Sequence, residues 1–173
     1  MWPELTVVQV DAHADLRRNF EGSPYNHACA MNRVRKLGAP LVQVGIRSLT
    51  VEERELIRDD GGIRTFFIHD LADRAAAEWA QEVAASVEGP CYLTVDLDGL
   101  DPAIMPSTGT PEPGGLDWHG ISALVKALAE RGPIVGADVV ELAPIPGLVA
   151  PDFLAARLAL RIAGFAARSQ GRL

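Results

Sequence analysis

The sequence predicts an α/β fold in which a mainly parallel sheet carries helices on both faces. Short apolar runs alternate with amphipathic stretches along the whole chain of 173 residues, as repeated β-α units require. Hydrophobic residues make up 48% of the chain, enough to fill a core between the sheet and the helices. The sequence contains no linker-like, low-complexity or repeated stretch, so we expect a single domain over residues 1–173.

Five strands are predicted from short runs rich in Val, Ile, Leu or aromatic residues, at 5–10, 41–46, 63–68, 91–97 and 134–142. The amphipathic stretches between and after them are expected to be helices, at about 25–37, 50–60, 71–87, 117–131 and 151–167. Several helix ends are marked by their residues. Gly38 is expected as a C-cap, Thr50 and Glu53 as a capping box, Asp117 as an N-cap, and Pro151 in a first turn.

A long irregular segment, "DGLDPAIMPSTGTPEPGGL", follows the fourth predicted strand at 98–116. It contains four prolines and four glycines, and a loop of this length in a compact domain is usually functional. Within it, Asp101 stands before Pro102 and is interpreted as a turn former.

Composition limits the partners. The net charge is −7 and no dense block of Lys and Arg is present, which argues against a nucleic-acid partner and leaves a small cationic substrate open. The most apolar late segment, "FLAARLALRIAGFAA", is too short to cross a bilayer and contains Arg157 and Arg161. No signal peptide is visible, and we interpret Cys29 and Cys91 as buried free thiols, so we expect a cytoplasmic protein without membrane contact.

Two acidic clusters follow predicted strands. Asp11, His13 and Asp15 come directly after the first strand, and Asp96 and Asp98 lie at the end of the fourth. Open parallel sheets bind ligands beyond the carboxyl ends of their strands, so we expect the clusters to meet at one sheet edge.

The charge of these clusters indicates metal. Four carboxylates in one crevice would repel and raise each other's pKa, and neither motif contains a basic residue. Carboxylates with one imidazole suit Mn²⁺, and also Ni²⁺, Zn²⁺ or Fe²⁺. Two cations would match the charge of four carboxylates. Bridging carboxylates would hold the cations about 3.5–4 Å apart, and the cations would lower the pKa of a bridging water. Either motif alone is also compatible with a loop of capping aspartates.

Five segments together resemble the ureohydrolases, the family of arginase and agmatinase: "DAHADLR", "GSPYNHACAMNRV", "VQVGIRS", "YLTVDLDGLDPAIMPSTGTPEPGGL" and "DVVELAPIPGLVAPDFLAARL". The resemblance extends over nearly the whole chain. The "DLDGLDP…TGTPEPGGL" pattern is highly specific, and "GSPYNHA" and "VVELAPIPG" are most similar to bacterial and archaeal agmatinases.

The resemblance implies a three-layer αβα arginase-like fold and a binuclear Mn²⁺ centre. Asp11 and Asp96 would bridge the metals, His13 and Asp98 would complete one shell, and Asp15 would bind the other metal. The implied reaction is hydrolysis of agmatine to putrescine and urea by a metal-bridging hydroxide, a step of polyamine biosynthesis.

Further roles come from the same resemblance. His27 matches a family histidine that acts in proton transfer or contacts the amine. Glu141 matches the carboxylate that pairs with the guanidinium group of the substrate, and Thr110 matches a position near that group. Asp15 is expected to be catalytic together with His27 and Glu141. Without the resemblance, His27 would be interpreted as a helix-facing histidine and Glu141 as a solvated residue at the end of a strand. His69 and His119 match no motif and are expected to be surface or capping residues.

Family members have an upstream segment with a "GGDH"-type motif, whose histidine completes the first metal's shell, and this sequence contains no such motif. We therefore expect an N-terminally truncated domain, the C-terminal two-thirds of the usual one. It would be a fragment from a truncated gene, one piece of a split enzyme, a member that recruits a ligand from a neighbouring subunit, or a non-catalytic remnant. The site without its histidine is expected to bind metal weakly or stay empty, and the isolated chain to have little activity.

Other functions compete with this interpretation. "DLDGLD" is similar to the D-x-D-G-T signature of haloacid-dehalogenase phosphatases, but it lies on the fourth strand and continues with Leu100, Asp101 and Pro102. A deacetylase of related fold and a non-enzymatic assembly module are further alternatives. Within the family, the substrate could be agmatine, arginine, guanidinobutyrate or another guanidino compound, and trimers or hexamers are common.

Overall fold

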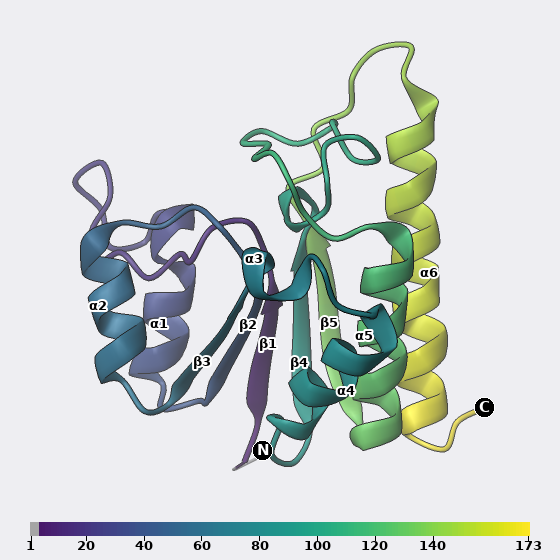
Figure 1. Cartoon of the computed structure of the whole chain (residues 1–173), viewed down its shortest axis with the longest axis horizontal. Helices are drawn as coiled ribbons and strands as arrows, with labels where there is room; N and C mark the ends of the chain where they lie inside the picture. Colours follow the sequence, from purple (N-terminus) through teal and green to yellow (C-terminus); the bar gives the residue numbers. More distant parts are fainter. Residues whose placement is uncertain (1–3) are drawn as a thin grey trace.

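The structure is a computed structural model that describes residues 4–173. Five strands form one parallel sheet in the order β3-β2-β1-β4-β5 (Figure 1). Their bounds are Thr6–Val10 for β1, Leu41–Ile46 for β2, Ile63–Phe67 for β3, Cys91–Asp96 for β4 and Ile134–Val140 for β5. The predicted strands are thus confirmed, each to within two residues at its ends.

The helices are largely those predicted: α1 at Ala30–Lys36, α2 at Val51–Asp59, α3 at Ile68–Leu71, α4 at Ala76–Ala85, α5 at Trp118–Arg131 and α6 at Val149–Ser169. Two short 3₁₀ turns, η1 at His27–Cys29 and η2 at Leu97–Gly99, complete the list. The helix predicted for 71–87 is confirmed only over α4, because α3 ends at Leu71 and α4 begins at Ala76. Ala75 has extended backbone (φ −61°, ψ 128°), which separates α3 from α4 and lets α4 start in a new direction.

The predicted helix ends are confirmed. Thr50 and Glu53 form the complete capping box of α2, and the side chain of Asp117 accepts a hydrogen bond from the backbone N of Gly120 at 2.6 Å. Gly38 follows α1 with a φ of 84°, a conformation that favours glycine, and its N–H donates to the carbonyl of Arg35. Pro151 lies in the first turn of α6.

Helices cover both faces of the sheet, so the molecule has three layers (Figure 1). Strand residues alternate between the faces. One face carries Val7, Leu41 and Ile63, which pack with α1 and α2; the other carries residues such as Val8 and Leu93, which pack with α4, α5 and α6. The predicted α/β class with helices on both faces is therefore confirmed. Within residues 4–173, none of the helices combines the length and the apolar character needed to cross a bilayer.

Strand β5 is an edge of the sheet within the described residues. Large apolar side chains are exposed at its end and along the start of α6. This β5–α6 surface consists of Val140, Leu142, Ile145, Leu148, Val149 and Phe153.

Candidate metal centre

The two acidic clusters meet where β1 and β4 end, as the sequence predicts. The strands are paired in parallel with Val10 opposite Val95, so Asp11 and Asp96 leave the sheet side by side. Asp11, His13 and Asp98 each present one donor atom, and these three atoms lie within 4.8 Å of one another. Two carboxylates and one imidazole from distant parts of the chain thus converge on one point.

The imidazole of His13 faces the carboxylates through Nδ1. This atom lies 3.0 Å from Oδ2 of Asp98 and 3.6 Å from Oδ1 of Asp11, while Nε2 points to Oε1 of Glu112 at 3.7 Å. The atoms Nδ1 of His13, Oδ1 of Asp11 and Oδ2 of Asp98 are therefore the natural donors for a shared cation.

Hydrogen bonds hold both carboxylates in place. Asp11 is 3% exposed, and its Oδ1 accepts from the backbone N of His13 at 2.6 Å. Asp98 accepts from the backbone N of Ala12 at 3.0 Å and from Oγ1 of Thr110 at 3.0 Å. The Ala12 bond ties the loop after β1 to the turn η2 after β4.

Asp96 and Asp15 lie beside this group rather than in it. Asp96 caps η2, because its Oδ1 accepts from the backbone N of Asp98 at 2.9 Å. Asp15 has a φ of 54°, in the left-handed region, and its carbonyl accepts from the backbone N atoms of Met31 and Asn32 at the start of α1. The structure therefore brings one donor atom from each of three of the five predicted ligands to within 4.8 Å of the others, and leaves Asp15 and Asp96 adjacent.

The pKa values reflect crowded negative charge. Burial, reinforced by the charge of Asp11, raises the pKa of Asp15 to about 8 and that of Asp96 to about 9. Burial raises the pKa of Asp11 to about 6. Hydrogen bonds to Asp11 and Asp98 raise the pKa of His13 to about 10. For Asp98, burial is outweighed by hydrogen bonds from His13, Ala12 and Thr110 and by the His13 charge, and its pKa is lowered.

This donor set fits a divalent cation. One imidazolium cannot balance the carboxylates of four aspartates, and Asp11, Asp15 and Asp96 respond by holding protons more tightly. Oxygen donors with one imidazole nitrogen are the ligands that Mn²⁺ and its neighbours accept. The residues present could therefore hold such an ion in place of these protons.

The predicted substrate residues are placed unevenly. Thr110 contacts Asp98 directly. Glu141 follows β5 with a φ of 64° and is exposed; its carboxylate lies near Gly109, beside Thr110, and its charge contributes to the raised pKa of Asp96.

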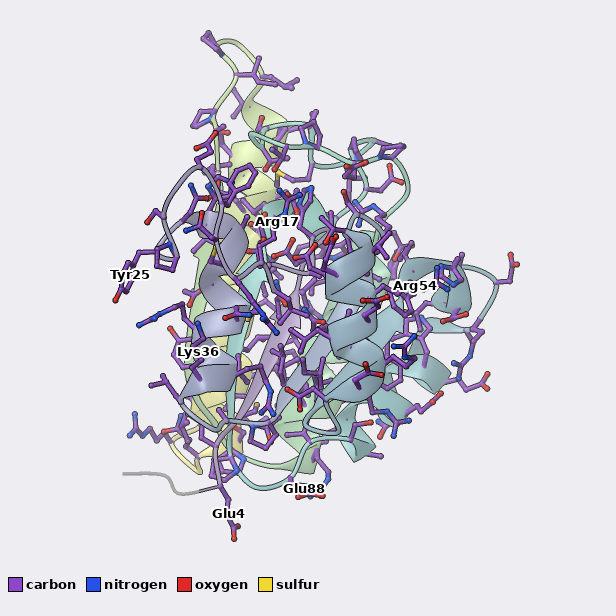
Figure 2. The ribbon with its side chains drawn as sticks, turned by 90° about the vertical axis from the view of Figure 1, so that its left-hand side faces the viewer. Glu4, Arg17, Tyr25, Lys36, Arg54 and Glu88 are labelled. Atoms are coloured by element: carbon purple, nitrogen blue, oxygen red, sulfur yellow. The ribbon has the colours of Figure 1, made fainter. Side chains whose placement is uncertain are left out.

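His27 is not brought into contact with the other predicted site residues. Within residues 4–173 its side chain is exposed, forms no hydrogen bond or ion pair with them, and packs edge-on against Phe20 with ring centroids 5.8 Å apart. The loop that precedes it lies at the surface, where Tyr25 is 76% exposed and projects outward (Figure 2).

The less specific interpretations agree with the structure. Asp101 forms a turn, since its Oδ1 accepts from the backbone N of Ala103 at 2.7 Å. His69 and His119 are exposed, and Cys29 and Cys91 are buried free thiols.

Several residues that support the site were missed, among them Gln9, Glu53 and Arg47. Gln9 donates to Asp11, Glu53 accepts from the backbone N of Leu16 at 2.8 Å, and Arg47 donates to the carbonyl of Asp98 at 2.7 Å. A signal was present for Gln9, a polar residue inside the otherwise apolar run "VVQV". Glu53 was identified only as a capping residue, and Arg47 gave no signal of its own.

The chain is similar to known proteins over nearly its whole length. The arginase family model matches residues 1–164. The N(1)-aminopropylagmatine ureohydrolase of Synechocystis sp. is 43% identical over 166 residues, which cover 95% of this chain and 53% of that protein. The agmatinase of Pyrococcus horikoshii is 32% identical over 163 residues, 94% of this chain and 56% of that protein.

Solved structures give the same result. The agmatine ureohydrolase of Thermoplasma volcanium superposes with a TM-score of 0.81 at 31% identity, covering 97% of this chain and 57% of that one. The proclavaminate amidino hydrolase of Streptomyces clavuligerus superposes with a TM-score of 0.82 at 30% identity, covering 95% and 56%. The chain spans about half the length of the curated relatives it matches.

Proposed function

The chain belongs to the arginase family, and from this premise we propose that it carries the metal and substrate residues of a ureohydrolase acting on agmatine. In the proposed reaction, water adds to the guanidinium carbon, the bond from that carbon to the alkyl nitrogen breaks, and a proton passes to the departing amine. The products are urea and putrescine. A second candidate substrate is N(1)-aminopropylagmatine, which is favoured by the 43% identity to a ureohydrolase named for that compound.

The observation that carries this proposal is the convergence of Asp11, His13 and Asp98 within 4.8 Å. We assign these residues, with Asp15 and Asp96 beside them, to two Mn²⁺ ions. When bound, the ions would supply a water acidic enough to act as hydroxide at neutral pH.

The remaining roles belong to side chains around this point. We assign Glu141 to the guanidinium, because a carboxylate can accept two parallel hydrogen bonds from that planar group. Thr110 follows Gly109, which lies near the carboxylate of Glu141, and its hydroxyl donates to Asp98. We assign it to orient the same end of the substrate. We assign proton transfer to His27 on the family resemblance, and its exposed position leaves it open to an incoming amine.

Metal binding and urea release test the proposal together. Calorimetric titration with MnCl₂ should show binding to the parent chain and its loss in Asp11→Asn and Asp98→Asn. The exposed Asp70→Asn is the control and should bind like the parent. Urea should be released from agmatine or its aminopropyl derivative in preference to arginine and guanidinobutyrate. A parent chain that binds no Mn²⁺ and releases no urea would instead support a non-enzymatic assembly module.

We also propose that the chain associates with copies of itself, as trimers or hexamers. The exposed apolar side chains of the β5–α6 surface support association. Light scattering coupled to size-exclusion chromatography should give a mass of three or six times 18.5 kDa. A monomer at all concentrations would contradict this.

A further inference from the structure

A chain of side-chain hydrogen bonds crosses three neighbouring strands and ends on Asp11. The hydroxyl of Thr65 on β3 donates to Oε1 of Gln43 on β2 at 2.9 Å. Nε2 of Gln43 donates to Oε1 of Gln9 on β1 at 2.6 Å, and Nε2 of Gln9 donates to Oδ2 of Asp11 at 2.7 Å. The sheet register aligns these residues, because Gln9 lies opposite Gln43 and Gln43 opposite Thr65.

The same amides also hold the loop that follows β1. Gln9 donates a second time, to the carbonyl of His13 at 3.3 Å, and Gln43 donates a second time, to the carbonyl of Ala14 at 2.8 Å. Both N–H groups and the oxygen of each amide are therefore in use. The donors point from β3 toward the carboxylate of Asp11. An ionised carboxylate has no hydrogen to donate, so it can end the chain only as an acceptor.

Core stability alone does not account for these residues. Gln9 is 1% exposed and Gln43 is fully buried, and Val7 and Leu41 on the same face of the sheet pack into an apolar cluster. Burying an amide costs free energy that its hydrogen bonds only offset, whereas Val or Leu at these positions would gain from burial. What the amides provide instead is a fixed direction for Asp11 and a fixed path for the backbone of His13 and Ala14.

We propose that Gln9, Gln43 and Thr65 are positioning residues of the metal centre. They orient Oδ2 of Asp11 and hold the peptides that precede Asp15, whose backbone lies in the left-handed region. This role rests on the proposed metal function. Outer groups that orient metal ligands typically change metal affinity by about 10–100-fold when removed.

Variants of matched shape test the role. Gln9→Met and Gln43→Met keep the length of the side chain and remove its amide. Thr65→Val removes the hydroxyl at the start of the hydrogen-bond chain, and Thr65→Ser keeps a hydroxyl there. The control is Thr94→Val. Thr94 lies two residues before Asp96, as Gln9 lies two residues before Asp11, but its hydroxyl donates to Asp138 at 2.7 Å rather than to a predicted ligand.

Titration with MnCl₂ should give a Kd about 10–100-fold higher for Gln9→Met and Gln43→Met. Thr65→Val should show a smaller increase in the same direction, and Thr65→Ser and Thr94→Val should stay within about twofold of the parent. Parent affinity in folded Gln9→Met, or an equal loss in Thr94→Val, would overturn the proposal.

Amide hydrogen exchange of the metal-free chain separates this result from the proposed function. Residues 12–16 should exchange faster in Gln9→Met and Gln43→Met than in the parent or Thr94→Val, after correction for global stability. If the parent chain binds no Mn²⁺, the metal assignment fails, and the exchange result still decides whether the amides position the loop. Unchanged exchange at 12–16 would overturn that role.

Discussion

Gly99 shows how closely the two halves of the site approach. A Cβ atom at this position would lie 2.8 Å from the backbone N of Asp11, 3.0 Å from Cγ1 of Val10 and 3.1 Å from Cα of Asp11. Real Cβ atoms do not come so near to backbone, so only glycine allows η2 to rest on the end of β1. This contact is what lets Asp98 reach His13.

Gly99→Ala should therefore damage the site more than the fold. The added methyl group has to push η2 away from Asp11, and overpacking of this kind costs about 1–3 kcal/mol. We expect Mn²⁺ affinity to fall at least about tenfold, since donor positions tolerate little displacement. Calorimetry with MnCl₂ and urea unfolding would measure both effects. Gly61→Ala is the control, because a Cβ at Gly61 meets nothing within 4 Å; equal Mn²⁺ affinity in the two variants would contradict the argument.

Single residues were predictable from sequence where the strand ends determine them. Asp11, His13 and Asp98 follow apolar runs, and the ends of parallel strands meet at one edge. Gln9 and Gln43 were not predictable as partners, because their pairing depends on the register of β1 and β2, set by contacts distant in sequence. The left-handed backbone of Asp15 was likewise hidden, since it depends on the approach of α1.

At the level of elements, Arg47 fastens the loop of residues 109–115 to the sheet. It follows β2, and its guanidinium donates to the carbonyls of Asp98 at 2.7 Å, Glu112 at 2.9 Å and Pro113 at 3.2 Å. One planar group thus connects the turn that carries Asp98 with the loop that carries Thr110. This segment has few regular hydrogen bonds of its own, so the side chain substitutes for secondary structure.

Arg47→Lys should loosen that loop and leave the sheet intact. A single ammonium on a flexible stem cannot reproduce a rigid fork that bonds several carbonyls at once. We expect faster hydrogen exchange and faster proteolytic cleavage within residues 109–115, with a rise in KM for agmatine where activity is measured. Arg58→Lys is the control, since Arg58 forms an exposed pair with Asp59. Identical cleavage in both variants would show that Arg47 does not hold the loop.

Elements with their own local signals were predicted well. All five strands and the caps of α2 and α5 were identified, because apolar runs and capping side chains act over a few residues. The short helix α3 and the break after it were missed, since residues 72–75 contain no proline or glycine. The turn η2 was missed because its cap is Asp96, which was identified only as a ligand.

At the scale of the whole molecule, the metal-free chain carries charged groups whose proton binding depends on folding. Asp15 and Asp96 have pKa values raised to about 8 and about 9, so the folded chain holds protons that the unfolded chain releases near pH 4. His13 has a pKa raised to about 10, so in the folded chain it stays protonated at pH values above its ordinary pKa. The lowered pKa of Asp98 acts only in acid, below the ordinary range of a carboxyl group.

These shifts predict that the metal-free chain loses stability as the pH rises. A group whose pKa is higher in the folded chain than in the unfolded chain stabilises the fold at pH values below its unfolded pKa. That stabilisation disappears as the pH rises toward the pKa of the folded chain. The free energy of unfolding in EDTA should therefore fall between pH 6 and pH 9, by at least about 1 kcal/mol. With MnCl₂ the trend should reverse relative to EDTA, because metal binding requires deprotonated ligands and releases their protons.

Urea unfolding at pH 6, 7, 8 and 9 measures both series. Asp15→Asn should make the EDTA series less steep, because Asp96 and His13 still contribute, while Asp70→Asn, at an exposed site, should leave it unchanged. A stability that rises from pH 6 to pH 9 in EDTA would mean that these carboxyl groups are ionised in the metal-free fold, and the charge argument for a cation at this site would then fail.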